Sequence, residues 1–334
     1  MKAIVLLSGG LDSTLAARIS KDFDIELIAF NTISPFCLCN HRSSTGCFHG
    51  AAAAAKDLGL KFVSLDVAPE FLKIVASPEH GYGSNMNPCI DCRILLFRKA
   101  KELMAAEGAS FIITGEVSGQ RPMSQRKVTL QLIEREAGLE GLVVRPLSAK
   151  VLPETIPEQK GWISREKLLS ISGRSRRDQF ALAKEFGIND YPCPSGGCLL
   201  TDPMFCNKVK DLVDHGTLDN DNVRLLRIGR HFRLSPTAKL IVGRDESENE
   251  RLLAYTEKTD FSFIPDERFP GPNALGKGCF DEKLKELSLS IVARYCDGEA
   301  GQARLIGVQE RGTGVPEPRY SLPMEEDAIA SYRL

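Results

Sequence analysis

A segment near the N-terminus that is rich in glycine and serine has the composition of a phosphate-binding loop. Its six residues are Ser8, Gly9, Gly10, Leu11, Asp12 and Ser13. Glycine lets the main chain approach a ligand closely, and the helix expected to follow offers free N–H groups and its positive dipole end. The serine hydroxyls can donate to phosphate oxygens, and Asp12 can help to hold Mg²⁺. The segment predicts a pyrophosphate cradle; the plainer alternative is a strand-to-helix turn with an aspartate cap.

Two cysteines, Cys89 and Cys92, stand at the start of a second expected helix. The positive end of that helix and the neighbouring Arg93 should lower the pKa of both thiols, so that more of each is thiolate. Thiolates act as nucleophiles and as metal ligands. Because Cys-x-x-Cys spacing does not identify a metal, both uses remain open at this point.

A further group of metal-ligand residues follows the second expected strand. Three cysteines and two histidines fall within thirteen residues, a density that suits a tetrahedral zinc site. They are Cys37, Cys39, His41, Cys47 and His49. The alternative is an exposed loop that carries a few reducible thiols. Three cysteines stand alone in the second half of the chain and are expected to be small buried side chains, namely Cys206, Cys279 and Cys296.

Two basic stretches could contact nucleic acid phosphates. Residues 224–244 contain no acidic residue, and the arginines expected to face RNA are Arg227, Arg230 and Arg233. A second patch consists of Arg174, Arg176 and Arg177. The plainer alternative for the longer stretch is the solvated face of a small sheet.

Length and composition exclude several classes of protein. A chain of 334 residues suggests about two domains, and 43% hydrophobic with 26% charged residues is typical of globular proteins. The formal net charge of −1 gives no global attraction for nucleic acid, so any RNA affinity must come from local patches. The N-terminal apolar run is too short for a signal peptide. We therefore expect a cytoplasmic protein without membrane contact, in which the ten cysteines are ligands or thiols rather than disulfides.

Short apolar runs that suit buried parallel strands alternate with helical segments in the first half of the chain. The expected strands cover residues 3–7, 25–31, 62–67, 110–114 and 142–144. The expected helices between these strands cover residues 12–21, 50–58 and 92–107; after residue 146 the alternation lapses, and two further helices are expected at 164–170 and 178–186. This rhythm predicts an α/β fold with a parallel, doubly wound sheet.

The pattern of apolar runs, glycines and prolines changes twice along the chain and suggests three segments. Residues 1–175 are expected to form the nucleotide-binding domain, and residues 176–214 a connecting segment that carries Cys193 and Cys198. From residue 215 to 334, short alternating runs separated by glycine and proline predict a smaller α+β domain.

The N-terminal part resembles the PP-loop ATP pyrophosphatase superfamily, whose fold is like that of adenine nucleotide alpha hydrolases. The loop at residues 8–13 carries this resemblance, and a second block at 113–120, with Ser124-Gln125 and residues 144–147, resembles tRNA 4-thiouridine synthases. The resemblance covers about residues 1–200. It implies that Thr114, Gly115 and Gln120 lie at the nucleotide, and that the chain adenylates its substrate and releases pyrophosphate.

The Asn-Pro-Cys segment at residues 87–89 is similar to one in PP-loop tRNA thiolases, where a downstream cysteine completes the site; Cys198 matches that position. Three thiolates can hold a [4Fe–4S] cluster and leave one iron open for sulfide, a pattern that the resemblance implies for Cys89, Cys92 and Cys198. Persulfide chemistry, zinc with Cys193 as fourth ligand, and inert thiols are the alternatives.

The C-terminal part, through residues 242–250, resembles NFACT-R-type RNA-binding domains. The combined resemblances imply ATP-dependent thiolation of tRNA uridine, with Asp12 and the three cysteines as catalytic residues. Expected cofactors are ATP, Mg²⁺, a [4Fe–4S] cluster and zinc. Expected partners are tRNA and a sulfur donor, either sulfide or a persulfide carrier, and the sequence also allows a homodimer. The alternatives are a ligase that uses an amine nucleophile, and an RNA-binding protein with a vestigial nucleotide site.

Overall fold

The computed structural model describes residues 1–37, 46–189, 191, 197–255, 260–310 and 315–334. The chain divides into two compact units, Met1–Asp202 and Pro203–Leu334. This division falls inside the segment 176–214 that was expected to connect two domains. None of the described helices is long and apolar enough to cross a membrane.

The N-terminal unit is built on a five-stranded parallel sheet with the order β3-β2-β1-β4-β5. The strands are β1 (Lys2–Leu6), β2 (Glu26–Ile33), β3 (Lys61–Asp66), β4 (Phe111–Thr114) and β5 (Val143–Val144). All five lie within two residues of the expected positions. The order runs outward in both directions from the β1–β4 pair, so loops after these two strands leave the sheet on opposite faces. The doubly wound parallel fold is confirmed.

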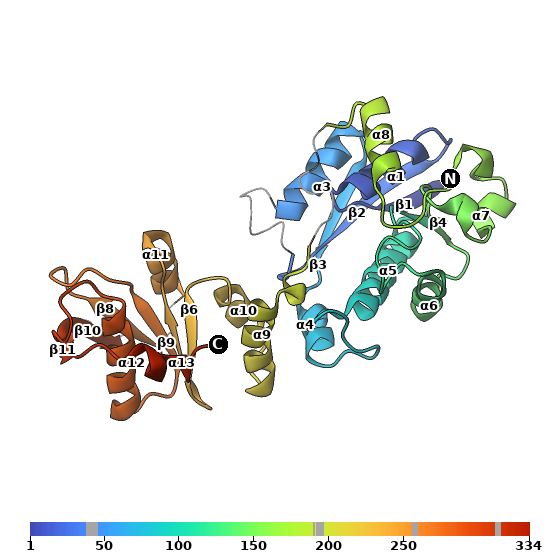
Figure 1. Ribbon diagram of the computed structural model, residues 1–334. Helices are drawn as coiled ribbons and strands as arrows, with labels where there is room; N and C mark the ends of the chain where they lie inside the picture. The colour runs from blue at the N-terminus through green and yellow to red at the C-terminus, as the bar shows by residue number, and fades with distance from the viewer. Residues whose placement is uncertain (38–45, 190, 192–196, 256–259, 311–314) are drawn as a thin grey trace. The chain divides into compact units, whose positions relative to one another are not determined.

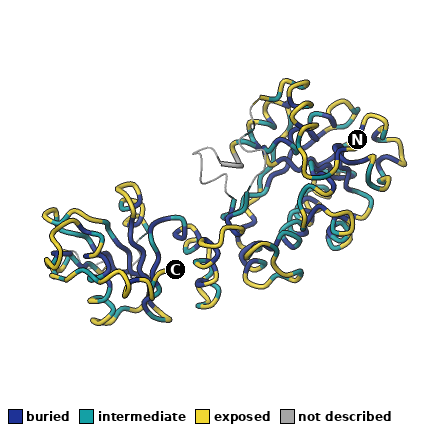
Figure 2. The backbone as a smooth tube through the Cα atoms, in the orientation of Figure 1, coloured by how far each residue is buried: buried dark blue, intermediate teal, exposed yellow. Residues whose placement is uncertain are grey.

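Helices cover both faces of this sheet (Figure 1). One face packs against α1 (Leu11–Ser20), α3 (Gly46–Asp57) and α8 (Arg177–Glu185). The other packs against α5 (Cys89–Ala106) and α6 (Lys127–Ala137). Figure 2 shows the consequence, since the central strands are buried along their length.

Short elements complete the unit. They are α4 (Ala68–Ala76), α7 (Ile156–Gln159) and the 3₁₀ turns η1 (Ala149–Val151), η2 (Arg165–Lys167) and η3 (Leu199–Thr201). The helix expected at 164–170 is wrong, because only the turn η2 forms there. Arg165 instead donates to Glu158 at 2.6 Å and to the Leu152 carbonyl at 2.8 Å, and these bonds tie the segment to α7.

The C-terminal unit is a six-stranded antiparallel sheet with helices, as expected for an α+β domain. Its strand order is β11-β10-β8-β9-β7-β6. The strands are β6 (Arg230–Ser235), β7 (Ala238–Val242), β8 (Phe261–Pro265), β9 (Ala274–Gly278), β10 (Arg304–Glu310) and β11 (Glu317–Ser321). The helices are α9 (Pro203–Asp214), α10 (Asn220–Leu225), α11 (Glu246–Ala254), α12 (Glu282–Arg294) and α13 (Glu326–Ala330).

A buried ion cluster joins α9 to the sheet within this unit. Asp211 accepts two hydrogen bonds from the Arg233 guanidinium, at 2.8 and 2.7 Å, and one from Lys239 at 2.9 Å. These two cations hold the pKa of Asp211 below its usual value, although burial acts in the opposite direction. Removing one partner from such a cluster leaves an uncompensated buried charge, so Arg233 has a structural task.

Candidate functional site

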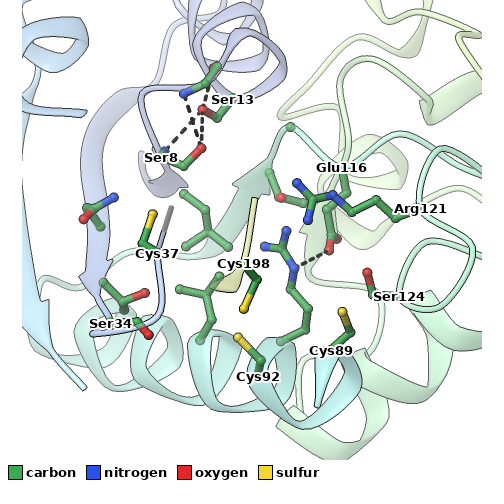
Figure 3. A pocket seen from close by; sticks show the side chains of 18 of the residues that line it. Ser8, Ser13, Ser34, Cys37, Cys89, Cys92, Glu116, Arg121, Ser124 and Cys198 are labelled. Carbon is green, nitrogen blue, oxygen red and sulfur yellow. Dashed lines mark hydrogen bonds and ion pairs between the residues drawn. The ribbon is translucent and has the colours of Figure 1, made fainter. Parts of the chain in front are cut away.

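The site lies where β1 and β4 end side by side, at the reversal of strand order. Open parallel sheets bind ligands at such a switch point, because the loops that follow the two strands separate there. A pocket of about 320 Å³ occupies this position. It is lined by the loop after β1, the end of β2, the first turn of α5, the loop after β4, and Cys198 (Figure 3).

The loop after β1 is held in shape by its own serines. The Ser13 hydroxyl donates to the Gly10 carbonyl at 2.9 Å and accepts from the Ser8 N–H at 3.2 Å, and the two hydroxyls lie 3.1 Å apart. Gly9 has a φ of +74°, and a Cβ there would lie 2.5 Å from the Gly50 carbonyl carbon. Glycine is therefore required for this turn on two grounds, conformation and space.

Gly115, directly after β4, lies against the backbone of this loop. A Cβ at Gly115 would stand 2.4 Å from the Asp12 carbonyl oxygen and 2.5 Å from the Ser13 nitrogen. Gly115 and Thr114 line the pocket together with Ser8, Gly10, Asp12 and Ser13. The structure thus brings together most of the residues expected at the nucleotide.

Asp12 carries an unsatisfied buried oxygen. Its Oδ2 accepts a hydrogen bond from Gln120 at 2.7 Å and lies 3.7 Å from the Arg176 guanidinium, whereas its buried Oδ1 has no hydrogen-bond partner. Burial raises the pKa of Asp12, against the effects of Gln120 and Arg176. A carboxylate oxygen in this state suits a divalent cation, because oxygen ligands hold Mg²⁺ and its charge would offset the cost of burial.

Gln120 does not line the pocket; it contacts the site only by its hydrogen bond to Asp12. Its own orientation depends on Gln179 of α8, which donates to the Gln120 amide oxygen at 3.0 Å. Gln179 is fully buried and was not singled out from the sequence. Gln179 orients Gln120 only because α8 lies close to α1. No local sequence motif indicates this packing.

Four cysteines from three distant segments line the pocket: Cys37, Cys89, Cys92 and Cys198. The expected lowering of thiol pKa is wrong, because burial outweighs the nearby Arg93 and Arg121. Burial raises the pKa of Cys89, that of Cys92 to about 11 and that of Cys198 to about 12. Thiolates in this pocket therefore need a positively charged ligand to compensate them.

The spacing of these thiols bears on which metal could bind. Among the described residues, the one group of three ligand atoms lying within 4.8 Å of one another is Glu79, His80 and Asp91; no three pocket thiols do so. Thiolates about 2.3 Å from one tetrahedral zinc ion would stand only about 3.8 Å apart. A four-iron cluster is wider than one ion, so its ligand sulfurs stand farther apart. A single zinc ion held by three of these thiols would therefore require the sulfurs to move closer together.

The second cysteine group can be placed only in part. Cys39 and His41 lie outside the described residues, as does Cys193, and only the backbone of Cys47 is described, within α3. Cys37 lines the pocket and His49 is exposed. Of the three isolated cysteines, Cys206 and Cys296 are buried as expected. Cys279 is exposed, so that expectation is wrong; it follows the end of β9, where the strand meets solvent.

Three arginines make the pocket basic: Arg93, Arg121 and Arg176. Burial, together with the charges of Arg93 and Arg176, lowers the pKa of Arg121. The buried Glu116 also lines the pocket and lies among these positive charges. It lies 3.6 Å from the Arg93 guanidinium, and it also accepts from Arg145 at 3.1 Å. Neither Arg121 nor Glu116 was expected at the site; Glu116 stands in the block at residues 113–120 that carries the family resemblance, and Arg121 directly follows that block.

The remaining basic residues are distributed unevenly. Arg174 and Arg177 are exposed, whereas their neighbour Arg176 belongs to the pocket. In the C-terminal unit, Arg230 lies over the Tyr295 ring at 4.7 Å and donates to the Gly243 carbonyl at 2.9 Å. Arg227 is partly exposed, and Arg233 is bound to Asp211.

Family models match both units. Residues 1–136 match the tRNA methyl transferase HUP domain, and residues 229–333 match the NFACT protein RNA-binding domain. The N-terminal unit is a PP-loop domain. This match confirms the resemblance inferred from the loop at residues 8–13, and the second match confirms the NFACT-R resemblance.

Curated relatives match part of the chain. A tRNA-specific 2-thiouridylase, MnmA, of Pelobacter propionicus is 30% identical over 119 residues, 34% of this chain and 33% of the relative. A probable tRNA sulfurtransferase of Methanosarcina mazei is 29% identical over 123 residues, 36% of this chain and 29% of the relative. The chain thus spans about a third of the length of these relatives.

Among solved structures, a 4-thiouridine synthetase in complex with RNA and ATP is similar with a TM-score of 0.39. The sequence identity is 21%, and the match covers 68% of this chain and 52% of that chain.

The contact between Gly115 and the loop at residues 8–13 predicts that adding a methyl group at Gly115 disturbs the loop. We expect Gly115→Ala to displace the start of α1, destabilise the protein by roughly 1–3 kcal/mol and weaken ATP binding about tenfold or more. Calorimetric titration with Mg·ATP and thermal unfolding measure the two effects. The matched control is Gly108→Ala, where φ is +64° but nothing lies within 4 Å of the added Cβ. This variant should lose stability and keep its ATP affinity. Equal ATP affinity in the two variants would contradict the prediction.

Proposed function

We propose that this protein is an ATP-dependent tRNA thiolase, which activates a uridine as an adenylate and replaces its oxygen by sulfur. The observation that carries the proposal is the shared pocket, which holds a phosphate-type loop and the thiols of Cys89, Cys92 and Cys198. The partial relatives support it, because the MnmA protein and the probable sulfurtransferase are both named for tRNA thiolation. The match of residues 229–333 to an RNA-binding domain supports tRNA as the partner.

The first half-reaction is adenylation. The uridine carbonyl oxygen attacks the α-phosphorus of ATP, a phosphorus–oxygen bond forms, and pyrophosphate leaves. Loop N–H groups and the hydroxyls of Ser8 and Ser13 would bind the pyrophosphate, as helix N-termini bind anions generally. Arg121 and Arg176 would add positive charge where negative charge develops. Asp12 would hold the Mg²⁺ that accompanies ATP.

The second half-reaction exchanges oxygen for sulfur. A sulfur nucleophile attacks the activated ring carbon, the bond from this carbon to the phosphate-bearing oxygen breaks, and AMP leaves. Adenylation is needed because it turns a poor leaving group into a good one. The pocket walls contributed by α5 and the end of β2 would exclude water, which would otherwise return the adenylate to uridine.

The three cysteines fit a [4Fe–4S] cluster by donor type and number, and all three line one pocket. Cys89, Cys92 and Cys198 would hold it, and when bound it would supply an iron that takes up sulfide as the nucleophile. A persulfide carried by one of the thiols is the alternative sulfur source. Its outer sulfur would attack the ring carbon, and a second cysteine thiol would then attack the inner sulfur, so that the sulfur–sulfur bond breaks and a protein disulfide remains as the thiouridine leaves. This alternative is an outcome of the experiment below. The zinc site at Cys37, Cys39, Cys47 and His49, the homodimer and the cytoplasmic location stay predictions.

The adenylation step predicts loss of pyrophosphate exchange in two loop variants. Asp12→Ala removes the magnesium ligand and Ser13→Ala removes a phosphate donor, so exchange of labelled pyrophosphate into ATP with tRNA present should fall about a hundredfold or more. Circular dichroism should stay unchanged. The control, Asp57→Ala, removes an exposed carboxylate at the end of α3 and should exchange at the wild-type rate.

Either loop variant exchanging pyrophosphate like the wild type would overturn the loop assignment. A wild-type protein that binds tRNA but shows no exchange would favour an RNA-binding protein with a vestigial site. Full formation of an amine-linked product by variants that lack the cysteines would favour the amine ligase.

The proposed cluster site predicts that the iron content of the purified protein depends on three cysteines. Protein purified without oxygen should be brown and contain iron and acid-labile sulfide, and both should be lost on changing Cys89, Cys92 or Cys198 to alanine. Cys193→Ala should have a milder effect, because the fourth iron must stay open for sulfide. Cys279→Ala, which removes an exposed thiol of the C-terminal unit, is the matched control and should leave iron unchanged. A colourless protein that thiolates tRNA with a persulfide donor would exclude the cluster.

The C-terminal unit predicts a salt-dependent RNA contact. Replacing Arg227 and Arg230 by alanine should lower the slope of log Kd against log salt by about 0.7–0.9 for each lost phosphate contact. Arg233→Ala should instead lower stability by about 3–5 kcal/mol, because it leaves Asp211 buried with one fewer partner. Filter binding over a salt series and thermal unfolding separate the two effects. Arg135→Ala, an exposed arginine of α6, is the control, and an unchanged slope in the double variant would place RNA elsewhere.

A further inference from the structure

Cys37, the fourth thiol of the pocket, pairs across two short extended segments with Cys198. The two residues form an isolated antiparallel bridge, in which the Leu199 N–H donates to the Phe36 carbonyl at 2.9 Å. Cys37 follows the end of β2, and Cys198 precedes η3, so the pair joins segments about 160 residues apart in the chain. Both side chains line the pocket (Figure 3).

The hydrogen-bond pattern fixes the kind of pair. In an antiparallel bridge whose flanking residues exchange the hydrogen bonds, the two facing residues are a non-hydrogen-bonded pair, with Cα atoms about 4.5 Å apart. Disulfides form between cysteines whose Cα atoms lie about 4.4–6.8 Å apart. Side chains of such a pair point to the same side. The main chain therefore holds Cys37 and Cys198 at a spacing that suits a disulfide. The bond needs a rotation of the side chains, because the Cys198 sulfur points toward Cys92 in Figure 3.

Buried neighbours hold both cysteines in place. Phe36 is 1% exposed and packs edge-on against Phe71 with ring centroids 5.8 Å apart, so the residue before Cys37 is anchored in the core. Leu199 and Leu200 are also buried, directly after Cys198. Each cysteine is thus anchored on one side by buried neighbours, Cys37 by the residue before it and Cys198 by the residues after it.

We propose that Cys37 and Cys198 form a thiol–disulfide exchange site for small disulfides of the glutathione class, and that the resulting disulfide closes the sulfur site. The consequence for sulfur chemistry rests on the proposed function, since Cys198 is one of the three cysteines assigned to the cluster. With Cys198 bound to Cys37, only Cys89 and Cys92 remain as thiol ligands of that set. The site then responds to the redox state of its surroundings.

The exchange takes place in two steps. One thiol of the pair loses its proton as it attacks a sulfur of the small disulfide; a mixed disulfide forms, and the small thiolate that is released takes up this proton. The second protein thiol then loses its proton and attacks the protein sulfur of the mixed disulfide, the mixed bond breaks, and a second small thiol leaves with that proton. Two protein thiols are oxidised and one small disulfide is reduced to two thiols. An excess of the small thiol reverses both steps.

The experiment maps disulfides in the full-length protein without ATP or tRNA. Iron-free protein is equilibrated without oxygen over a series of reduced and oxidised glutathione ratios, its free thiols are blocked, and its peptides are identified by mass spectrometry. We expect a peptide linking Cys37 to Cys198 to become the main disulfide product as the ratio becomes oxidising. Cys37→Ser should remove it, and the control Cys279→Ser should leave it unchanged.

A second measurement tests the consequence. Oxidised wild-type protein should take up several-fold less iron on reconstitution than reduced protein, whereas oxidised Cys37→Ser should take up as much as its reduced form. A Cys89–Cys92 disulfide in place of the expected one, no intramolecular disulfide at any ratio, or equal loss of iron uptake in Cys37→Ser would each overturn the proposal. Failure of pyrophosphate exchange would overturn the proposed function while leaving the mapped disulfide intact, so the two failures are distinguishable.

Discussion

The close approach of two backbone segments at the centre of the parallel sheet organises the N-terminal unit. Gly115 lies where a Cβ would meet the backbone of Asp12 and Ser13, so the loop after β4 and the start of α1 are in direct contact. This contact arises because β1 and β4 are paired in parallel with Leu6 opposite Thr114, so the segments that follow the two strands begin side by side before they diverge. The pocket, the orientation of Asp12 and the placement of Arg121 all depend on the geometry of this junction.

Much of the fold could be predicted because its signals are local. Each buried strand is a short apolar run, and the glycines of the loop at residues 8–13 mark the turn into α1. The helix expected at 164–170 does not form, because hydrogen bonds from Arg165 to Glu158 of α7 and to the Leu152 carbonyl outweigh a weak local preference for helix. Tertiary contacts override propensity in this way wherever the segment is short.

Site residues that belong to a sequence motif could be predicted. Site residues that come together only because distant segments pack against each other could not. Gln179 and Arg121 have no pattern of their own, and their roles follow from packing around Asp12 and the cysteines. The place of Cys37 beside the pocket was within reach, since it follows the strand next to β1 and parallel strands end at one edge. The burial of the thiols could not be predicted from the sequence. It raises the pKa values of Cys89 and Cys92, whereas the sequence had indicated lower values.

Burial of charge explains why such different groups share one pocket. Asp12 keeps a buried oxygen without a hydrogen-bond partner, and its pKa is raised, while the pKa of Arg121 is lowered by burial and by two neighbouring arginines. A bound cation would stabilise the charged form of Asp12, and a bound anion would stabilise the charged form of Arg121. A magnesium–nucleotide complex carries both charges on one ligand and would relieve both groups together. Binding of such a complex would return part of the free energy that burying these side chains costs, so the charges of the pocket favour the ligand that the proposed function requires.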